Sequence, residues 1–292
     1  MNYLGEQLVN GLCLGTVYVL LAIGFNMVYG VLRLLNFAHS EVFMSGTFLS
    51  FLGLRLVEKM GWPPLLAVVV VALGAGLGCG LIALIIERVG YRPILDQPKV
   101  TSLITAIGFS ALLQNIFIRL FGAETRAFPS LELPMPPRGV AFLLASLATL
   151  FFYLLVQKAD IGIQMRAVSE NSRVAQLFGV NPGHISRFAF FFGGVLAAIG
   201  GMTWGLLYGT VNPQMGFLPG IKAFIIAVVG SIGNIWGSLV VGIGLGVAEA
   251  LIAAYLPSDV SGHRDSVAFL LLIVVLVIRP NGLFGSVESP KV

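Results

Sequence analysis

The sequence predicts an all-α, polytopic membrane protein with eight to ten transmembrane or re-entrant helices. Hydrophobic residues make up 57% of the chain and charged residues only 10%, whereas soluble domains carry about 25% charged residues. Several apolar runs reach about 20 residues, the length that an α-helix needs to cross about 30 Å of hydrocarbon. Many of the 36 glycines lie inside these runs, and small residues let helices pack closely in lipid.

The amino-terminal half of the chain predicts five spans. Their residues are 8–31, 37–57, 64–87, 100–121 and 138–157. Gly46 and Gly53 interrupt the second run. Residues 121–138 contain four prolines and cannot continue a helix, because proline lacks the backbone N–H that a helix interior needs. We therefore expect a loop between the fourth and fifth spans.

The carboxyl-terminal half predicts four more apolar helices. Their residues are 187–210, 219–233, 236–256 and 266–279. The run 219–233 is short, and the Gly233-Asn234 pair closes it. This pattern indicates a broken or re-entrant helix rather than a full span.

The polar segment 158–187 sets the expected orientation. Its basic residues are Lys158, Arg166, Arg173 and Arg187. Basic loops favour the cytoplasmic side of a membrane. Four crossings later the tail after Arg279 returns to that side, and counting backward places the amino terminus outside. The loop 121–138 then lies outside although it contains arginines, against the same bias.

A short helix is expected inside segment 158–187. Residues recur there at four-residue spacing, and Gly179 ends the pattern before Pro182. The apolar face is formed by Val174, Leu177 and Phe178, and the opposite face holds Glu170, Ser172, Arg173 and Gln176. One interpretation is an amphipathic helix that lies on membrane lipid. The mixed charge of the polar face favours the other interpretation, which is docking into a groove on a partner protein.

The sequence contains no motif for catalysis, metal binding or nucleotide binding. None of the five lysines is followed by Ser or Thr, as a Walker A loop requires, and HExxH, CxxC and GxSxG motifs are absent. An intramembrane transferase would need an Asp-rich box or clustered histidines, and neither is present. The net charge of +4 reports topology in a membrane protein rather than nucleic-acid binding. We expect no catalytic residue, no metal and no cofactor in this chain.

Polar residues interrupt the apolar sequence VLRLLNFAHSEVFMSG at 31–46. They are Arg33, Asn36, His39, Ser40 and Glu41. In a helix that starts at residue 36, Asn36, His39 and Ser40 share one face. Ionisable groups at membrane depth cost about 2.5–3.5 kcal/mol each, so they normally face a bundle interior or a water-filled path. The alternative is an interfacial position, with Asn36 as the helix cap and Arg33 reaching the lipid head groups.

Two further features are relevant to the interior of the bundle. Glu249 lies near the middle of a span, so it is expected to face the interior. Its expected partner is a polar side chain from Asn10, Asn26 or Gln114. Residues 29–46 and 208–220 both run from Tyr-Gly through Asn to a Gly near the start of a span. This weak similarity is of the kind found in transporters with duplicated halves.

Four stretches of the chain resemble the permease subunits of branched-chain amino acid ABC importers of the LivH type. They are GLCLGTVYVLLAIGFNMVYGVLRLLNFAHSEVFMSG (11–46), RAVSENSRVAQLFGVNP (166–182), AVVGSIGNIWGSLVVGIGLGVAE (227–249) and RPNGLFG (279–285). The Asn-Phe-Ala-His box of that family is Asn36 to His39 here, followed by the acid Glu41. Ser40 stands where many relatives have Gly. The four motifs are in the family's order and cover nearly the whole chain.

The resemblance implies an ABC importer permease fold and a multi-pass protein of the bacterial inner membrane. Residues 1–292 would form a single permease domain with a cytoplasmic coupling segment at 158–187. Its implied partners are a second, similar permease, two cytoplasmic ATPase subunits that bind ATP and Mg²⁺, and a periplasmic solute-binding protein. The implied activity is uptake of Leu, Ile or Val by alternating access. Urea or short-chain amide uptake is the runner-up.

Two groups of site residues follow from the resemblance and the residue chemistry together. The substrate path or gate is assigned to Asn36, His39, Ser40, Glu41 and Glu249. Coupling to the ATPase is assigned to Glu170, Asn171, Arg173, Gln176 and Gly179. A rival hypothesis is an ion-coupled secondary transporter in which Glu249 and His39 carry protons.

Overall fold

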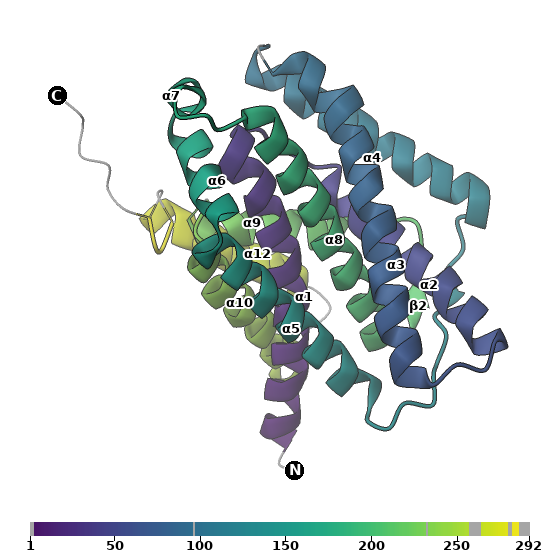
Figure 1. Ribbon diagram of the computed structural model, residues 1–292. Helices are drawn as coiled ribbons and strands as arrows, with labels where there is room; N and C mark the ends of the chain where they lie inside the picture. Colours follow the sequence, from purple (N-terminus) through teal and green to yellow (C-terminus); the bar gives the residue numbers. More distant parts are fainter. Residues whose placement is uncertain (1–2, 96, 232, 257–263, 280–281, 286–292) are drawn as a thin grey trace.

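The computed structural model describes residues 3–95, 97–231, 233–256, 264–279 and 282–285. These residues are almost entirely helical, and the helices form one bundle (Figure 1). Seven of the described helices are long and apolar enough to cross a membrane. They are α1 (Tyr3–Leu32), α2 (His39–Lys59), α3 (Pro64–Ile85), α4 (Lys99–Phe121), α5 (Pro137–Lys158), α8 (Pro182–Tyr208) and α10 (Ile235–Tyr255).

Two shorter apolar helices complete the bundle, α9 (Phe217–Val229) and α12 (Arg264–Ile278). At about 1.5 Å per residue, the 13 residues of α9 span about 20 Å, less than the hydrocarbon thickness of about 30 Å. The prediction that the run 219–233 is not a full-length helical span is therefore confirmed. The seven long helices together with α9 and α12 make nine among the described residues, roughly consistent with the predicted number.

The remaining elements are short. α3 continues through a π-helical turn (Ile86–Tyr91) and a 3₁₀ turn (Arg92–Ile94). α6 (Asp160–Glu170) and α7 (Ser172–Leu177) occupy the polar segment between α5 and α8. β1 (Arg126–Ala127) and β2 (Thr210–Val211) form a small antiparallel pair. This pair ties the loop after α4 to the segment after α8.

Local sequence signals set the ends of α8. This helix begins at Pro182 rather than at 187, because Asn181 Oδ1 accepts hydrogen bonds from the N–H groups of Gly183 and His184 at 3.0 and 3.2 Å. An asparagine in this position satisfies backbone donors that the first turn leaves unpaired. The helix ends before Gly209, whose φ of 65° is a left-handed conformation that glycine adopts readily.

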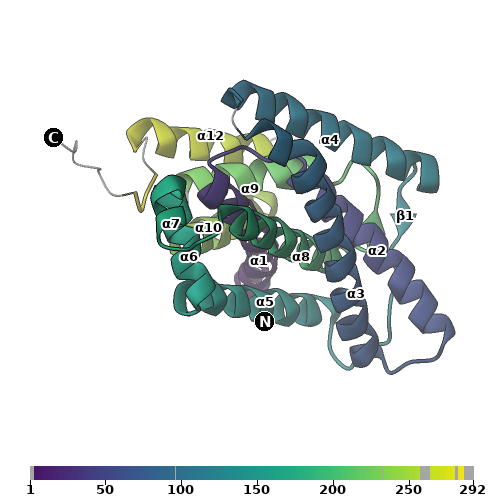
Figure 2. The same ribbon diagram turned by 45° about the horizontal axis from the view of Figure 1, so that its top comes forward.

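α1 and α8 lie at the centre of the bundle, with α5 on one side and α9 and α12 on the other (Figure 2). α10 runs antiparallel to α1, since Gly15 lies against Ile243 and Asn26 donates to Ser238. A Cβ at Gly15 would lie 2.8 Å from the Cα of Ile243. The glycines of this contact therefore allow the two backbones to touch, as small residues between packed membrane helices do.

The polar segment and the described part of the tail lie at one end of the bundle. The N–H of Leu283 donates to the carbonyl of Val229, at the end of α9, at 2.7 Å. Met165 of α6 lines a pocket with Gly233, just beyond the same helix end. The prediction that segment 158–187 and the tail share a side is thus confirmed. In Figure 1 this is the end marked by α7, opposite the amino terminus.

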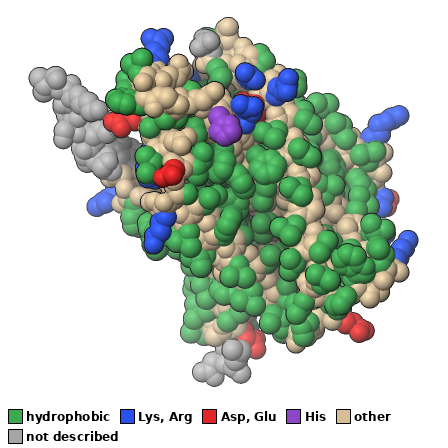
Figure 3. Space-filling model, in the orientation of Figure 1, with side chains coloured by type: hydrophobic (Ala, Val, Ile, Leu, Met, Phe, Trp, Pro, Cys, Tyr) green, Lys and Arg blue, Asp and Glu red, His purple; other side chains and the backbone are tan. Residues whose placement is uncertain are grey.

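The outer surface of the bundle is apolar across its middle. Figure 3 shows hydrophobic side chains covering the centre of one face, with Lys and Arg gathered toward the upper end and the edges. Large exposed apolar residues on α3, α4 and α5 include Leu73, Leu77, Leu81, Ile104 and Leu147. Such a surface suits contact with lipid rather than water.

Candidate functional site

The chain turns back into the bundle between α1 and α2. Arg33 has a φ of 54°, and α2 does not begin until His39, whose imidazole packs against Gly24 of α1. Gly24 lies eight residues before the end of α1 at Leu32, which corresponds to about 12 Å along the helix axis. α2 therefore starts inside the bundle, at a level that α1 has already passed before it ends.

The structure places the polar residues of the 36–41 segment, here called the polar box, in the bundle interior rather than at an interfacial position. Asn36, His39 and Glu41 are buried, with exposed fractions of 4%, 5% and 2%. The N-cap of α2 is Ala38, without a side-chain cap, so the interpretation of Asn36 as the cap is wrong. Asn36 instead accepts a hydrogen bond from Tyr91 at 3.2 Å.

The expected sharing of one helix face is only partly right. His39 and Ser40 belong to the first turn of α2, while Asn36 precedes the helix. Ser40 Oγ donates to the carbonyl of Phe37 at 2.6 Å. Glu41 is turned toward α4, where it accepts a hydrogen bond from Ser110 at 3.2 Å. Three of the box residues, Asn36, His39 and Ser40, still line one pocket.

The start of a second helix meets the start of α2 at this pocket. After β2 the chain re-enters the bundle, and α9 begins beside α2 because Gly216 and Gly220 both pack against Ser40. A Cβ at either glycine would overlap Ser40. The weakly similar segments 29–46 and 208–220 thus have corresponding structures. Each follows a long central helix and places the start of another helix in the bundle interior, a pattern seen at transporter sites.

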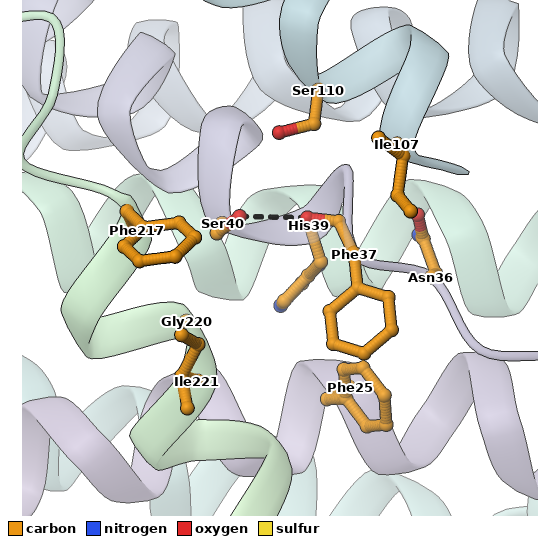
Figure 4. Close-up of a pocket in the computed structure, with 10 residues that line it drawn as sticks. All are labelled: Phe25, Asn36, Phe37, His39, Ser40, Ile107, Ser110, Phe217, Gly220 and Ile221. Atoms are coloured by element: carbon orange, nitrogen blue, oxygen red, sulfur yellow. Dashed lines mark hydrogen bonds between the residues drawn. The ribbon is translucent and has the colours of Figure 1, made fainter. Parts of the chain in front are cut away.

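The pocket between the two helix starts has a volume of about 280 Å³. α4 and α1 complete its walls (Figure 4). Its lining comprises Phe25, Asn36, Phe37, His39, Ser40, Ile107, Ser110, Phe217, Gly220 and Ile221. In Figure 4 the rings of Phe25 and Phe37 lie next to each other on one wall. Largely apolar walls with a few polar groups are typical of sites for small ligands.

Glu249 belongs to a separate buried cluster of charges. It is 2% exposed, so the prediction that it faces the interior is confirmed. Glu249 Oε1 lies 2.7 Å from Lys222 Nζ, and Glu249 Oε2 accepts a hydrogen bond from Tyr18 at 2.8 Å. Lys222 also lies 2.7 Å from Asp265. The cluster therefore joins α1, α9, α10 and α12.

The predicted partners of Glu249 were wrong. Asn26 donates to Ser238 at 2.6 Å, Gln114 donates to the carbonyl of Pro213 at 3.5 Å, and Asn10 accepts from Arg138 at 2.9 Å. The antiparallel register of α1 and α10 explains the error, because it brings Asn26 level with Ser238 rather than with Glu249.

Sequence reasoning did not select Lys222 or Asp265. A signal for Lys222 was present, since it is the single charged residue in the run 219–233 and an isolated lysine at membrane depth is as costly as an isolated glutamate. Asp265 stands at the edge of the last apolar run. Nothing in the local pattern of Asp265 distinguishes it from an interfacial residue.

The expected coupling helix is divided in two. α6 ends at Glu170 and α7 begins at Ser172, because Asn171 Oδ1 caps α7 by accepting from the N–H groups of Arg173 and Val174, both at 3.1 Å. Gly179 ends this region with a φ of 81°. Glu170, Ser172, Arg173 and Gln176 are exposed as expected. The expected apolar face is not buried, since Leu177 and Phe178 are 86% and 83% exposed.

The comparisons with known proteins identify the family. A family model described as branched-chain amino acid transport system / permease component matches residues 7–278. The chain belongs to this family. The permease is 37% identical to the high-affinity branched-chain amino acid transport system permease protein LivH of Salmonella typhimurium, across 99% of this chain and 98% of that relative. It is 38% identical to the corresponding protein BraD of Pseudomonas aeruginosa, across 98% and 97%.

One solved structure has the same fold. The permease matches a chain of PsaBC from Streptococcus pneumoniae in complex with Fab, with a TM-score of 0.53 and 14% identity over 97% of this chain and 94% of that chain. The predicted all-α permease fold and the predicted family are therefore confirmed. Together with the seven long apolar helices in the described residues, the family makes the permease a multi-pass protein of the inner membrane. Within the described residues, no group of three or more His, Cys, Asp or Glu side chains is placed to hold a metal ion.

Proposed function

We propose that the permease forms the passage of an ATP-driven uptake system for Leu, Ile and Val. The observation that carries this proposal is the meeting of the starts of two helices, α2 and α9, at a pocket inside the bundle. The names of relatives such as LivH and BraD support the substrate class. A largely apolar pocket with a few polar groups suits a small solute with an aliphatic side chain.

The passage works by alternating access. Asn36, His39 and Ser40 contribute to the pocket from the start of α2, and Glu41 holds α4 beside it through Ser110. A movement of α9 relative to α2 opens or closes the pocket, since the two helix starts touch at Ser40. Discrimination among solutes lies mainly in a periplasmic binding protein, and the passage itself is weakly selective.

The energy comes from partner subunits. The permease pairs with a second, similar permease, and two cytoplasmic ATPases bind ATP and Mg²⁺. Residues 1–292 act as a single permease domain, and segment 158–187 transmits the movement. The exposed Leu177 and Phe178 are the anchors of α7 in a groove on the ATPase. Glu170, Asn171, Arg173, Gln176 and Gly179 shape and surround this short helix.

The double variant Leu177→Ala/Phe178→Ala tests the coupling. Both side chains are more than 80% exposed, so their removal leaves the fold of the permease unchanged. Loss of an apolar anchor typically costs about 2 kcal/mol or more of binding free energy. We expect leucine uptake by the assembled transporter to fall at least about tenfold. The measurement is uptake of radiolabelled leucine into proteoliposomes.

The matched control is Leu120→Ala. It removes another exposed leucine, at 68% exposure, from the last turn of α4, outside segment 158–187. This variant should transport leucine at the normal rate. Normal uptake by the double variant would show that α7 does not dock on the ATPase.

A further inference from the structure

A second pocket adjoins the buried charge cluster. Its volume is about 380 Å³, and it lies toward the end of α8 and β2, opposite α7. Its lining comprises Tyr18, Trp204, Tyr208, Thr210, Asn212, Gln214, Met215, Leu218, Pro219, Lys222, Glu249 and Asp265. A third pocket, of about 200 Å³, shares Tyr208 and Glu249 with it and extends to Arg138 and Gln7. Glu249 therefore lies where the two pockets meet.

The charges around the second pocket do not balance. Two carboxylates, Glu249 and Asp265, face one ammonium group, Lys222. Lys222 is the single basic residue among the described residues that line this pocket. With all three groups ionised, the cluster has a net charge of −1. A ligand that enters the pocket is therefore favoured if it carries a positive charge.

Oxygen atoms of the protein already surround the ammonium group of Lys222. A lysine ammonium group has three hydrogens, and three oxygen atoms surround Lys222 Nζ: Glu249 Oε1 at 2.7 Å, Asp265 Oδ1 at 2.7 Å and Tyr18 OH at 3.0 Å. A ligand carboxylate would therefore have to compete with the two protein carboxylates that already lie against this lysine. The side chain of Asp265 is 37% exposed, so an acceptor is accessible from the pocket.

The remaining walls suit an aliphatic cation. Trp204, Met215 and Leu218 provide apolar contacts. The rings of Trp204 and Tyr208 lie 4.3 Å apart, and aromatic faces attract ammonium groups. The pocket thus offers acceptors for an ammonium group beside apolar walls for an alkyl chain.

We propose that this pocket binds the α-ammonium end of an aliphatic amino acid, with Asp265 and Glu249 as the acceptors. The identity of the ligand as an amino acid rests on the proposed function. The site lies at the end of the bundle opposite α7, so it receives the solute before the pocket between α2 and α9. Excess negative charge at this point rejects carboxylates that lack an ammonium group.

A ligand series on the purified full chain in nanodiscs of zwitterionic lipid tests this assignment by titration calorimetry. The ligands are leucine, its amine analogue 3-methylbutylamine, its acid analogue 4-methylpentanoate, and sodium chloride. We expect the amine to bind at least as tightly as leucine and the acid at least about tenfold more weakly. Equal binding of the acid, absence of amine binding, or displacement of the amine by equimolar sodium would each overturn the proposal.

The variant Asp265→Asn tests the contribution of the Asp265 carboxylate to ligand binding. This change leaves Lys222 and Glu249 as a balanced pair, so no buried charge loses its partner. We expect the dissociation constants of leucine and the amine to rise at least about tenfold, with an unchanged thermal unfolding midpoint. The control Glu124→Gln neutralises an exposed acid in the loop after α4 and should leave binding unchanged. Unchanged binding by Asp265→Asn would refute the role of this carboxylate.

The outcomes for the site and for the proposed function are separable. If the assembled transporter fails to take up leucine while the amine still binds and Asp265→Asn weakens it, the ammonium site stands and the proposed function fails. If leucine uptake is robust while Asp265→Asn alters neither binding nor uptake, the proposed function stands and the site fails.

Discussion

Lys222 lies at the centre of the buried charge cluster that also contains Glu249 and Asp265. It is 4% exposed, and its contacts with Tyr18, Glu249 and Asp265 hold α1, α10 and α12 against α9. Buried charges are tolerated when they are paired and hydrogen-bonded. The buried pair of Lys222 and Glu249 therefore stabilises the arrangement of these helices only while both partners are present.

Lys222→Met should destabilise the permease strongly. The substitution leaves Glu249 without its cation in the interior, and breaking a buried ion pair costs about 3–5 kcal/mol. The double variant Lys222→Met/Glu249→Leu should recover most of this loss, because replacing both charges by apolar groups is often close to neutral. Denaturant unfolding in detergent measures both. Equal stability of the single variant and the wild type would contradict the account.

Residue-level prediction from the sequence succeeded for burial and failed for pairing. Glu249 was recognised as an interior residue because a lone acid in an apolar run is costly anywhere else. Its partner could not be predicted, because the partner depends on how α9 and α10 are aligned with α1. That alignment comes from glycine contacts between helices that lie far apart in the sequence.

At the scale of elements, the contact between α2 and α9 is the decisive feature. Both helices start inside the bundle, and Gly216 and Gly220 let α9 approach the backbone and side chain of Ser40. Sequence reasoning recognised α9 as too short for a span and found the similar segments that precede the two helices. It did not predict that the two helices touch, because local periodicity does not specify which helices contact each other in the fold.

Gly220→Ala should separate α9 from α2. The new Cβ would overlap the Cβ of Ser40, and overpacking of this kind costs about 1–3 kcal/mol. We expect leucine uptake by the assembled transporter to fall at least about tenfold. In the double variant Ser40→Gly/Gly220→Ala the overlapping atom is removed, so uptake should return to within about threefold of the wild type.

The control for this prediction is Gly244→Ala in α10. No heavy atom lies within 4 Å of a Cβ at Gly244, so alanine should be tolerated and should raise stability by up to about 1 kcal/mol. Transport in proteoliposomes and denaturant unfolding give the two readouts. Failure of Ser40→Gly to rescue Gly220→Ala would argue against the contact as the cause.

The break between α6 and α7 shows the limit of pattern reading at this scale. Asn171 fitted a four-residue repeat, so a continuous helix was expected across it. The asparagine instead caps α7, because its side chain competes with the helix for backbone N–H groups. The same break leaves Leu177 and Phe178 exposed at the tip of the segment.

At the scale of the whole molecule, composition alone was sufficient to predict a polytopic helical bundle. The lengths of the apolar runs predicted the long helices. The basic segment 158–187 and the described part of the tail lie at the same end of the bundle, as expected. The interior pockets could not be predicted in this way, because each is formed by residues from several helices that lie far apart in the sequence. The central claim is that the permease is a passage without its own source of energy.

Reconstitution tests this claim most directly. Proteoliposomes would contain either the purified permease alone or the permease assembled with its second permease, ATPases and binding protein. The account predicts accumulation of radiolabelled leucine in the assembled system with ATP, and none with the permease alone under a proton or sodium gradient. Uphill leucine accumulation by the permease alone on an ion gradient would contradict it.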